Sequence, residues 1–345
     1  MHASRQPFGS SRPPQDSDEP IRLTDSDAAL ARLSAVQKHY LADPFIRHFV
    51  PRAHLQSARP PLINIGTYVR SESIDWLVNT WIDMSKAEGK KCQIVSLGAG
   101  SDTRFWRIAA SHRIADVAKY IELDFPEITT KKAMVIRKSK DIGGMLSNIT
   151  VGSGGTTLHS DVYNLLATDL RHPPSSSLSP PLLNMLDKSL PTLLLFECVL
   201  VYMTPSASSS VIQWFVDYFD DSAPLGGIVY EMFGLEDSFG KVMKNNLMMR
   251  NVELPGAEPY PTKESLLQRF LAHRFTSAQA LTLREIRNAY VPRGELERIS
   301  HLEMLDEIEE LNLVLDHYAI TWGFKGQDGD GQWTNWGLQK EATVG

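Results

Sequence analysis

The sequence of 345 residues has few cysteines, because only Cys92 and Cys198 occur. Each lies in an apolar run typical of a strand, so we expect two reduced, buried thiols. Two such thiols exclude a disulfide framework and a cysteine-based zinc site. The histidines lack metal-ligand spacing such as H-E-x-x-H, and the G-x-S-x-G elbow of hydrolases is absent. The sequence therefore predicts neither a metal site nor a hydrolase nucleophile.

Long apolar runs and an excess of positive charge are also missing. No apolar run approaches the roughly 20 residues of a membrane helix, and the N-terminus lacks the apolar core of a secretory signal. A net charge of −6 gives no general attraction to nucleic acid or anionic lipid. A composition that is 42% hydrophobic and 22% charged is typical of a globular protein. We therefore expect a monomer in the cytoplasm or nucleus, with neither nucleic acid nor membrane as a partner.

Short apolar runs alternate with helical patterns along most of the chain, which predicts an α/β fold with a seven-stranded, mostly parallel sheet. Two helical segments precede the sheet, one starting at the capping candidate Thr24 and one at residues 65–84. We expect strands at residues 93–98, 119–125, 156–161, 192–200, 226–232, 278–283 and 317–325, and later helices at 126–140, 205–220, 262–273 and 294–315.

The expected organisation is one domain, residues 24–325, between a disordered N-terminal tail and a flexible C-terminal tail, residues 1–23 and 326–345. Within the domain we expect a helical N-terminal lid (24–92), a mobile loop (171–181) and a substrate-side insertion (234–261). The insertion is rich in methionine, and we interpret Met243, Met248 and Met249 as core filler in preference to a binding surface.

A glycine turn, "LGAGSDTRFW", follows the first expected strand and brings backbone close to a ligand. A dinucleotide fingerprint needs a third small residue, but Thr103 occupies that position. Asp102 places negative charge where a pyrophosphate would lie. The turn therefore disfavours NAD and favours a cationic cofactor such as S-adenosylmethionine, with Gly98, Ala99 and Gly100 as the backbone contacts.

Acidic residues at the ends of strands extend this hypothesis. Asp124 ends the second expected strand, where a carboxylate can accept hydrogen bonds from both ribose hydroxyls, and Glu122 on the same strand face is the competing candidate. Asp169 and Leu170 in "ATDL" follow the weak third strand, 156–161, and would bind the adenine amino group and cover the ring.

Glu197 interrupts the apolar run "PTLLLFECVLVYM". A carboxylate in such a run is costly unless it meets a cation or lies at the carboxyl edge of the sheet. We therefore expect Glu197 to contact the ligand near its methionyl part.

Several motifs together closely resemble the leucine carboxyl methyltransferases over about residues 24–324: "VQKHYLADPFIRHFV", "INIGTYVRSESID", "LGAGSDTRFWRI", "ELDFPEITTKKAMVI", "ATDL" and "FECVLVYMTP". The resemblance implies a Rossmann-like, seven-stranded S-adenosylmethionine-dependent methyltransferase fold with N-terminal helices and inserted substrate-binding segments. It also implies methylation of the C-terminal leucine carboxylate of the catalytic subunit of type 2A protein phosphatases. The cofactor contacts that it implies are Lys38, Arg70, Gly98, Asp124, Asp169, Leu170 and Glu197.

Methyl transfer to this carboxylate needs no general base, since an α-carboxyl group with a pKa of about 3.3 to 3.7 is ionised at neutral pH. We expect Arg70 to pair with a carboxylate in the site and Tyr202 to donate a hydrogen bond near it, although Tyr202 also fits a core aromatic and Lys38 a solvated lysine. The alternatives are a relative that methylates a small-molecule carboxylate or a modified tRNA base, and a noncatalytic module that keeps an adenosine pocket. The tRNA-modifying relatives carry an additional repeat domain, for which this chain has no room.

Overall fold

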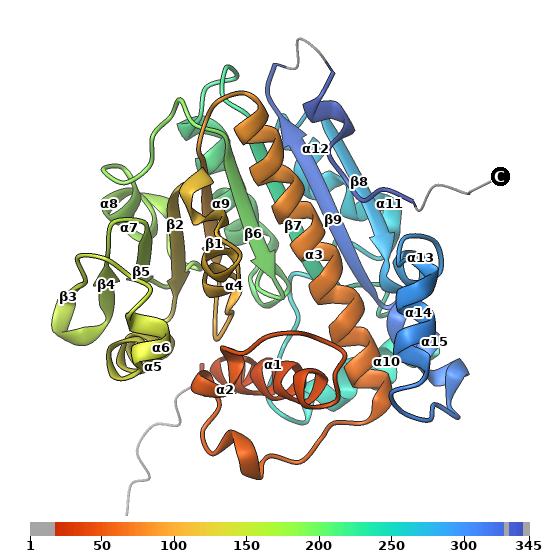
Figure 1. Ribbon diagram of the computed structural model, residues 1–345. Helices are drawn as coiled ribbons and strands as arrows, with labels where there is room; N and C mark the ends of the chain where they lie inside the picture. Colours follow the sequence, from red (N-terminus) through yellow and green to blue (C-terminus); the bar gives the residue numbers. More distant parts are fainter. Residues whose placement is uncertain (1–17, 328–330, 341–345) are drawn as a thin grey trace, which may run out of the picture.

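The computed structural model describes residues 18–327 and 331–340 and contains a nine-stranded central sheet (Figure 1). The strands are β1 (Cys92–Leu97), β2 (Val117–Asp124), β3 (Thr150–Gly152), β4 (Thr157–His159), β5 (Tyr163–Ala167), β6 (Thr192–Glu197), β7 (Leu225–Met232), β8 (Ser277–Thr282) and β9 (Tyr318–Lys325). Their order is β3-β4-β5-β2-β1-β6-β7-β9-β8. The five strands from β5 to β7 pair in parallel. The pairings of β7 with β9, β9 with β8, β5 with β4 and β4 with β3 are antiparallel.

The expected seven-stranded Rossmann-like fold is confirmed in the strands from β5 to β8, and β3 and β4 extend it. The prediction for the third strand was wrong in its position, because residues 156–161 include the antiparallel β4 and the parallel strand is β5. The chain turns between these strands, where Ser160 Oγ donates a 2.8 Å hydrogen bond to the carbonyl of Tyr163. Two short strands joined by a tight turn therefore resemble a single weak strand in the sequence.

Helices cover both faces of the sheet (Figure 1). They are α1 (Glu19–Gln37), α2 (Ile46–Phe49), α3 (Pro61–Ala87), α4 (Arg104–Ala110), α5 (Pro126–Lys138), α6 (Lys140–Gly143), α7 (Pro174–Ser177), α8 (Ser179–Leu182), α9 (Pro205–Tyr218), α10 (Ser238–Met248), α11 (Lys263–Leu266), α12 (Gln268–Leu271), α13 (Leu283–Ala289), α14 (Arg293–Ser300) and α15 (Ile308–Asp316). The predicted helix 262–273 is divided into α11 and α12, and 294–315 into α14 and α15. In the described residues, no helix combines the length and apolar character needed to cross a membrane.

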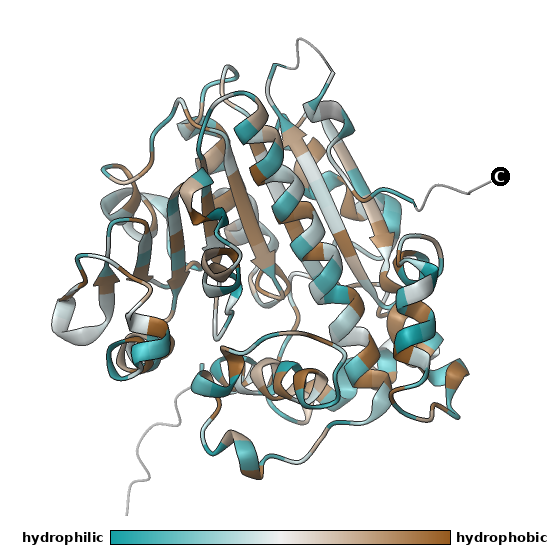
Figure 2. Cartoon of the chain, in the orientation of Figure 1, coloured by the Kyte–Doolittle hydropathy of each residue, from teal (hydrophilic) through white to brown (hydrophobic). Residues whose placement is uncertain are grey.

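The core has one layer on each face of the sheet. Successive residues of a strand point to opposite faces, so Ile94 of β1 packs in the cluster that contains α3, and Val95 packs in the cluster that contains α9. Figure 2 shows β6 as apolar along its length, whereas the visible side of α3 is largely hydrophilic. This burial on both faces is why the parallel strands read as continuous apolar runs.

The N-terminal helix begins earlier than predicted. α1 starts at Glu19, with Pro20 in its first turn, where the fixed φ of proline suits a helix and its missing N–H costs nothing. The predicted cap Thr24 lies inside α1 and donates a 2.6 Å hydrogen bond to the carbonyl of Ile21. The predicted tail is therefore wrong for residues 19–23, and residues 1–17 lie outside the described residues.

The segment expected to be a mobile loop, 171–181, forms α7 and the start of α8. Leu178 is fully buried, and Trp214 Nε1 of α9 donates a 2.9 Å hydrogen bond to Ser179 Oγ. In the insertion, Met243 packs against a small apolar cluster. Met248 and Met249 are 54% and 76% exposed, so the interpretation of both as core filler was wrong.

The C-terminal segment packs against α3. Trp333 and Trp336 are 3% exposed, and their ring centroids lie 4.5 and 4.9 Å from that of Trp81. Trp336 Nε1 also donates a 3.0 Å hydrogen bond to the carbonyl of Leu77. The prediction of a flexible tail was therefore wrong for this part, while residues 328–330 and 341–345 lie outside the described residues.

Candidate active site

A cavity of about 310 Å³ lies where β1, β2 and β6 end, and α1 forms one of its walls. An adjoining apolar pocket shares Gly98, Asp124 and Tyr202 with the cavity and adds residues that follow β5. Parallel strands end at the same edge of a sheet, which is why side chains distant in the sequence meet here. Together the two hollows collect most of the predicted residues: Arg70, Gly98, Ala99, Gly100, Asp124, Asp169, Leu170, Glu197 and Tyr202.

The glycine turn needs glycine for both conformation and space. Gly98 and Gly100 have φ values of +66° and +49°, in the left-handed region that side chains disfavour. A Cβ atom on Gly98 would lie 2.6 Å from Cγ2 of Val199, and one on Gly100 would lie 2.5 Å from Oδ1 of Asp25. Asp25 of α1 also accepts a 2.6 Å hydrogen bond from the backbone N–H of Ser101. The turn thus joins the ends of β1 and β6 to α1.

Asp124 is the acid of β2 that lines the cavity. Its carboxylate accepts hydrogen bonds of 2.7 Å from the backbone N–H groups of Gly100 and Phe125. Burial raises the pKa of Asp124 to about 6, and these two hydrogen bonds oppose the increase. The rival Glu122 is fully buried elsewhere, where its carboxylate lies 2.5 Å from Lys132 Nζ. Of the two candidates, Asp124 alone is placed to meet a ligand.

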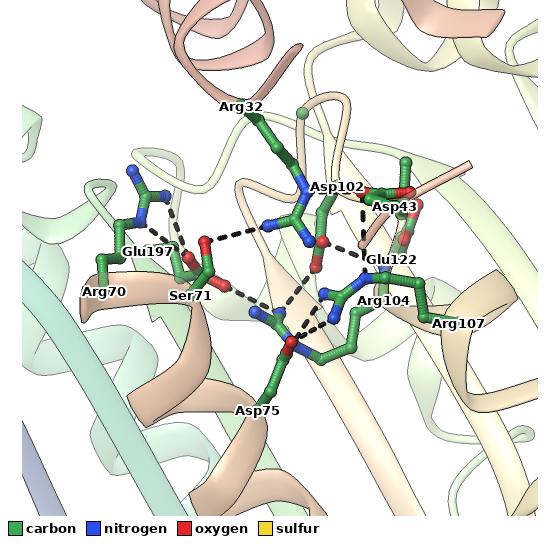
Figure 3. A network of polar contacts seen from close by, with 12 residues as sticks. Arg32, Asp43, Arg70, Ser71, Asp75, Asp102, Arg104, Arg107, Glu122 and Glu197 are labelled. Carbon is green, nitrogen blue, oxygen red and sulfur yellow. Dashed lines mark hydrogen bonds and ion pairs between the residues drawn. The ribbon is translucent and has the colours of Figure 1, made fainter. Parts of the chain in front are cut away.

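A network of arginines and carboxylates lies beside the cavity (Figure 3), and its members Arg32, Arg70, Asp102 and Glu197 line the cavity. At its centre Arg104, which is 2% exposed, lies 2.6 Å from Asp102, 2.8 Å from Asp75 and 2.7 Å from Glu197. Arg104 therefore offsets the charge of Asp102, and its proximity lowers the pKa of that carboxyl group against the effect of burial. The charge of Asp102 alone is consequently a weaker argument against a pyrophosphate than the sequence suggested.

Glu197 meets two cations at the end of β6. Arg70 of α3 binds Oε2 through Nε at 3.0 Å and Nη2 at 2.9 Å, and Arg104 approaches Oε1. The Arg70 guanidinium also lies 4.4 Å from the ring centroid of Tyr230. These cations offset the cost of a carboxylate in an apolar run, and the contact of Glu197 with a ligand stays a prediction.

Lys38 lies outside the cavity and is not brought together with the other predicted contacts. Its side chain is 41% exposed, and Nζ is 3.2 Å from Glu303. Arg32, six positions earlier on α1, lines the cavity instead and donates a 3.0 Å hydrogen bond to Ser71 Oγ. The residues of α1 that face the cavity include Ile21, Asp25, Ala28 and Arg32. Arg22, Thr24, Asp27, Ala29 and Ala31 of α1 also line it, so the helical period alone does not single out Arg32.

Two further residues after β6 line the cavity. Burial raises the pKa of Tyr202 well above its usual value, so its hydroxyl stays protonated at neutral pH. Cys198 has a φ of +53°, a strained value for a residue other than glycine, and burial raises the pKa of its thiol to about 12. Cys198 and Cys92 are free, as predicted, although Cys198 is only partly buried.

Comparison with known proteins agrees with this arrangement. The family model for leucine carboxyl methyltransferase matches residues 21–216. Leucine carboxyl methyltransferase 1 of Cryptococcus neoformans is 45% identical over 349 aligned positions, which cover 91% of this chain and 96% of the relative. The proteins of the same name from Schizosaccharomyces pombe and Bos taurus are 37% and 35% identical, with coverage of 88% and 92% of this chain and 93% of each relative. The chain therefore belongs to the leucine carboxyl methyltransferase family.

Proposed function

We propose that the protein uses S-adenosylmethionine to methyl-esterify the α-carboxylate of the C-terminal leucine of the catalytic subunit of type 2A protein phosphatases. Membership of the family supports carboxyl methyl transfer as the reaction class. The observation that carries the proposal is the cavity, which combines Asp124, the pocket at Asp169 and the pair of Arg70 and Glu197 at one edge of the sheet.

The described residues fit this cofactor. Each oxygen of Asp124 accepts one backbone hydrogen bond and keeps acceptor capacity for a ribose hydroxyl. Asp169 and Leu170 line the apolar pocket, where they would bind the adenine amino group and cover the ring. Two arginines and two carboxylates of the network line the cavity, so this wall suits a methionyl group that carries both an ammonium and a carboxylate: Arg32, Arg70, Asp102 and Glu197.

The cofactor supplies a methyl group bound to a positively charged sulfur. That chemistry would be a direct displacement at the methyl carbon by a substrate carboxylate oxygen, with the neutral thioether as the leaving group. The nucleophile is already ionised, so the protein must align and desolvate it. We propose that two groups align the substrate carboxylate: the N–H groups of Arg70 that do not bind Glu197, and the protonated hydroxyl of Tyr202.

The mouth of the cavity supports a protein substrate. Leu247 and Arg250 of the insertion line it together with Asp27 of α1, and Met248 and Met249 beside them are exposed. A folded phosphatase whose tail entered the cavity would contact these residues. We therefore expect a higher kcat/KM with intact phosphatase than with a free C-terminal peptide, and equal values would contradict this part of the proposal.

The function is tested by incubating the protein and labelled cofactor with the phosphatase catalytic subunit and analysing the mass of its C-terminal peptide. We expect one added methyl group on the terminal leucine, and none on a control subunit that lacks this leucine. Methylation of the truncated control would contradict the terminal leucine as the acceptor, and methylation of small carboxylic acids alone would favour the metabolite alternative. Cofactor binding without methyl transfer to any carboxylate would favour a noncatalytic module.

A further inference from the structure

Arg171, in the segment that follows β5, joins two carboxylates that are far apart in the sequence. Its Nη1 and Nη2 donate hydrogen bonds of 2.8 and 2.7 Å to the two oxygens of Asp18, which precedes α1. Its Nε and Nη2 donate bonds of 2.9 and 2.7 Å to the two oxygens of Asp169. Such paired contacts fix the guanidinium and both carboxylates in one plane more firmly than single bonds do.

The same guanidinium borders the apolar pocket proposed for adenine. Arg171 lines this pocket with Asp169 and Phe125, and its guanidinium carbon lies 5.1 Å from the ring centroid of Phe125. Ile21, three residues after Asp18 and in the first turn of α1, also lines the pocket. Arg171 therefore connects the residues after β5 to the helix that closes the pocket.

A simple surface ion pair is the alternative for Arg171, since its side chain is 32% exposed and that of Asp18 is 30% exposed. Exposed pairs contribute little to stability. This alternative does not account for the position of Asp169, whose carboxylate is 18% exposed and accepts a further 2.9 Å bond from the backbone N–H of Arg171. All of these contacts fix one carboxylate at the edge of the pocket.

We propose that Arg171 is a positioning residue for the cofactor: it orients Asp169 toward the adenine amino group and, through Asp18, holds α1 closed over the pocket. The proposal rests on the proposed function, because it requires an adenosine-containing cofactor. The two contacts have separable effects. The contact with Asp18 slows cofactor release, whereas the contact with Asp169 gives preference for a base that carries an amino group.

The test compares Asp18→Ala, Arg171→Ala and Arg171→Lys with Arg284→Ala, which removes an ion pair to Asp316 between α13 and α15. The probes are S-adenosylhomocysteine and its 6-oxo analogue, which lacks the amino group. We expect Asp18→Ala to speed dissociation of both probes about fivefold without changing their relative affinity. Arg171→Ala should speed dissociation about tenfold and also reduce the preference for the amino form.

Arg171→Lys should behave like Arg171→Ala, because an ammonium cannot pair with two carboxylates in one plane. In all three variants the KM for the cofactor should rise more than kcat falls, and the Arg284→Ala control should match the unaltered protein. The proposal is wrong if Asp18→Ala and Arg171→Lys change only the melting temperature, with dissociation rates and base preference unaffected. If the unaltered protein binds neither probe, the proposed function itself fails.

Discussion

Replacement of Asp124 by asparagine should change the stability of the protein by an amount that depends on pH. Burial raises the pKa of Asp124 from its ordinary value of 3.8 to about 6 in the folded protein. Each pKa unit corresponds to about 1.4 kcal/mol, so ionised Asp124 lowers the free energy of unfolding by about 3 kcal/mol at pH 8 relative to its protonated form. The loss develops as pH rises from 3.8 to about 6, because in that range the folded state holds the proton and the unfolded state does not.

At pH 5 the unaltered protein has already lost about half of this free energy of unfolding. The Asp124→Asn variant does not show this loss at any pH, because asparagine does not ionise. Asparagine cannot accept both backbone hydrogen bonds with oxygen, so the variant also loses about 1 to 3 kcal/mol at any pH. We therefore expect the stability of Asp124→Asn relative to the unaltered protein to be about 1.5 kcal/mol more favourable at pH 8 than at pH 5. The subtraction between the two proteins removes the contributions of other titrating groups.

Urea denaturation of both proteins at pH 5 and pH 8 measures this difference. Asp83→Asn is the matched control, because Asp83 is an exposed carboxylate on α3 away from the cavity, with a side chain that is 65% exposed. Calorimetry at pH 8 should also show that Asp124→Asn weakens cofactor binding by at least about tenfold, since the amide is a poorer acceptor for two ribose hydroxyls. An identical stability difference at both pH values would refute the argument for a costly buried charge, and unchanged cofactor affinity would refute the role of Asp124 in binding.

Three further predictions concern other parts of the molecule. Arg70→Ala should lower kcat/KM for methyl transfer by about 100-fold, because it removes both a cation in the cavity and the partner of Glu197; a loss of less than threefold would contradict its role. In steady-state kinetics, Arg32→Ala should raise the KM for the cofactor about tenfold, whereas Lys38→Ala should change it by less than about twofold. The reverse order would indicate that Lys38 is the cofactor contact. Trp336→Ala should lower the free energy of unfolding by about 3 to 5 kcal/mol in denaturant titrations and leave cofactor affinity unchanged. A loss of cofactor affinity in parallel with the loss of stability would contradict this prediction.

The sequence predicted the parts of the fold and site that depend on short stretches of chain. Buried parallel strands are continuous apolar runs, and acids such as Asp124 and Glu197 are conspicuous at their ends. Arg32 was missed because the position of α1 over the cavity depends on packing between distant elements. The contacts of Arg104 with Asp75 and Glu197 were missed for the same reason, since they join α4 to α3 and β6. Trp333 and Trp336 lie beyond the last strand, β9. Their packing on Trp81 shows that the folded domain extends past this strand.

The packing of the C-terminal segment on α3 has a practical consequence for attaching the protein to other molecules. Arg70 and Trp81 are about 16 Å apart along this helix, with Arg70 at the cavity and Trp81 toward the opposite edge of the sheet. The last described residues therefore lie away from the cavity mouth, whereas Asp18 lies at Arg171 beside the adjoining apolar pocket. A surface linkage or fluorescent label added after the C-terminus should therefore leave room for a phosphatase to dock.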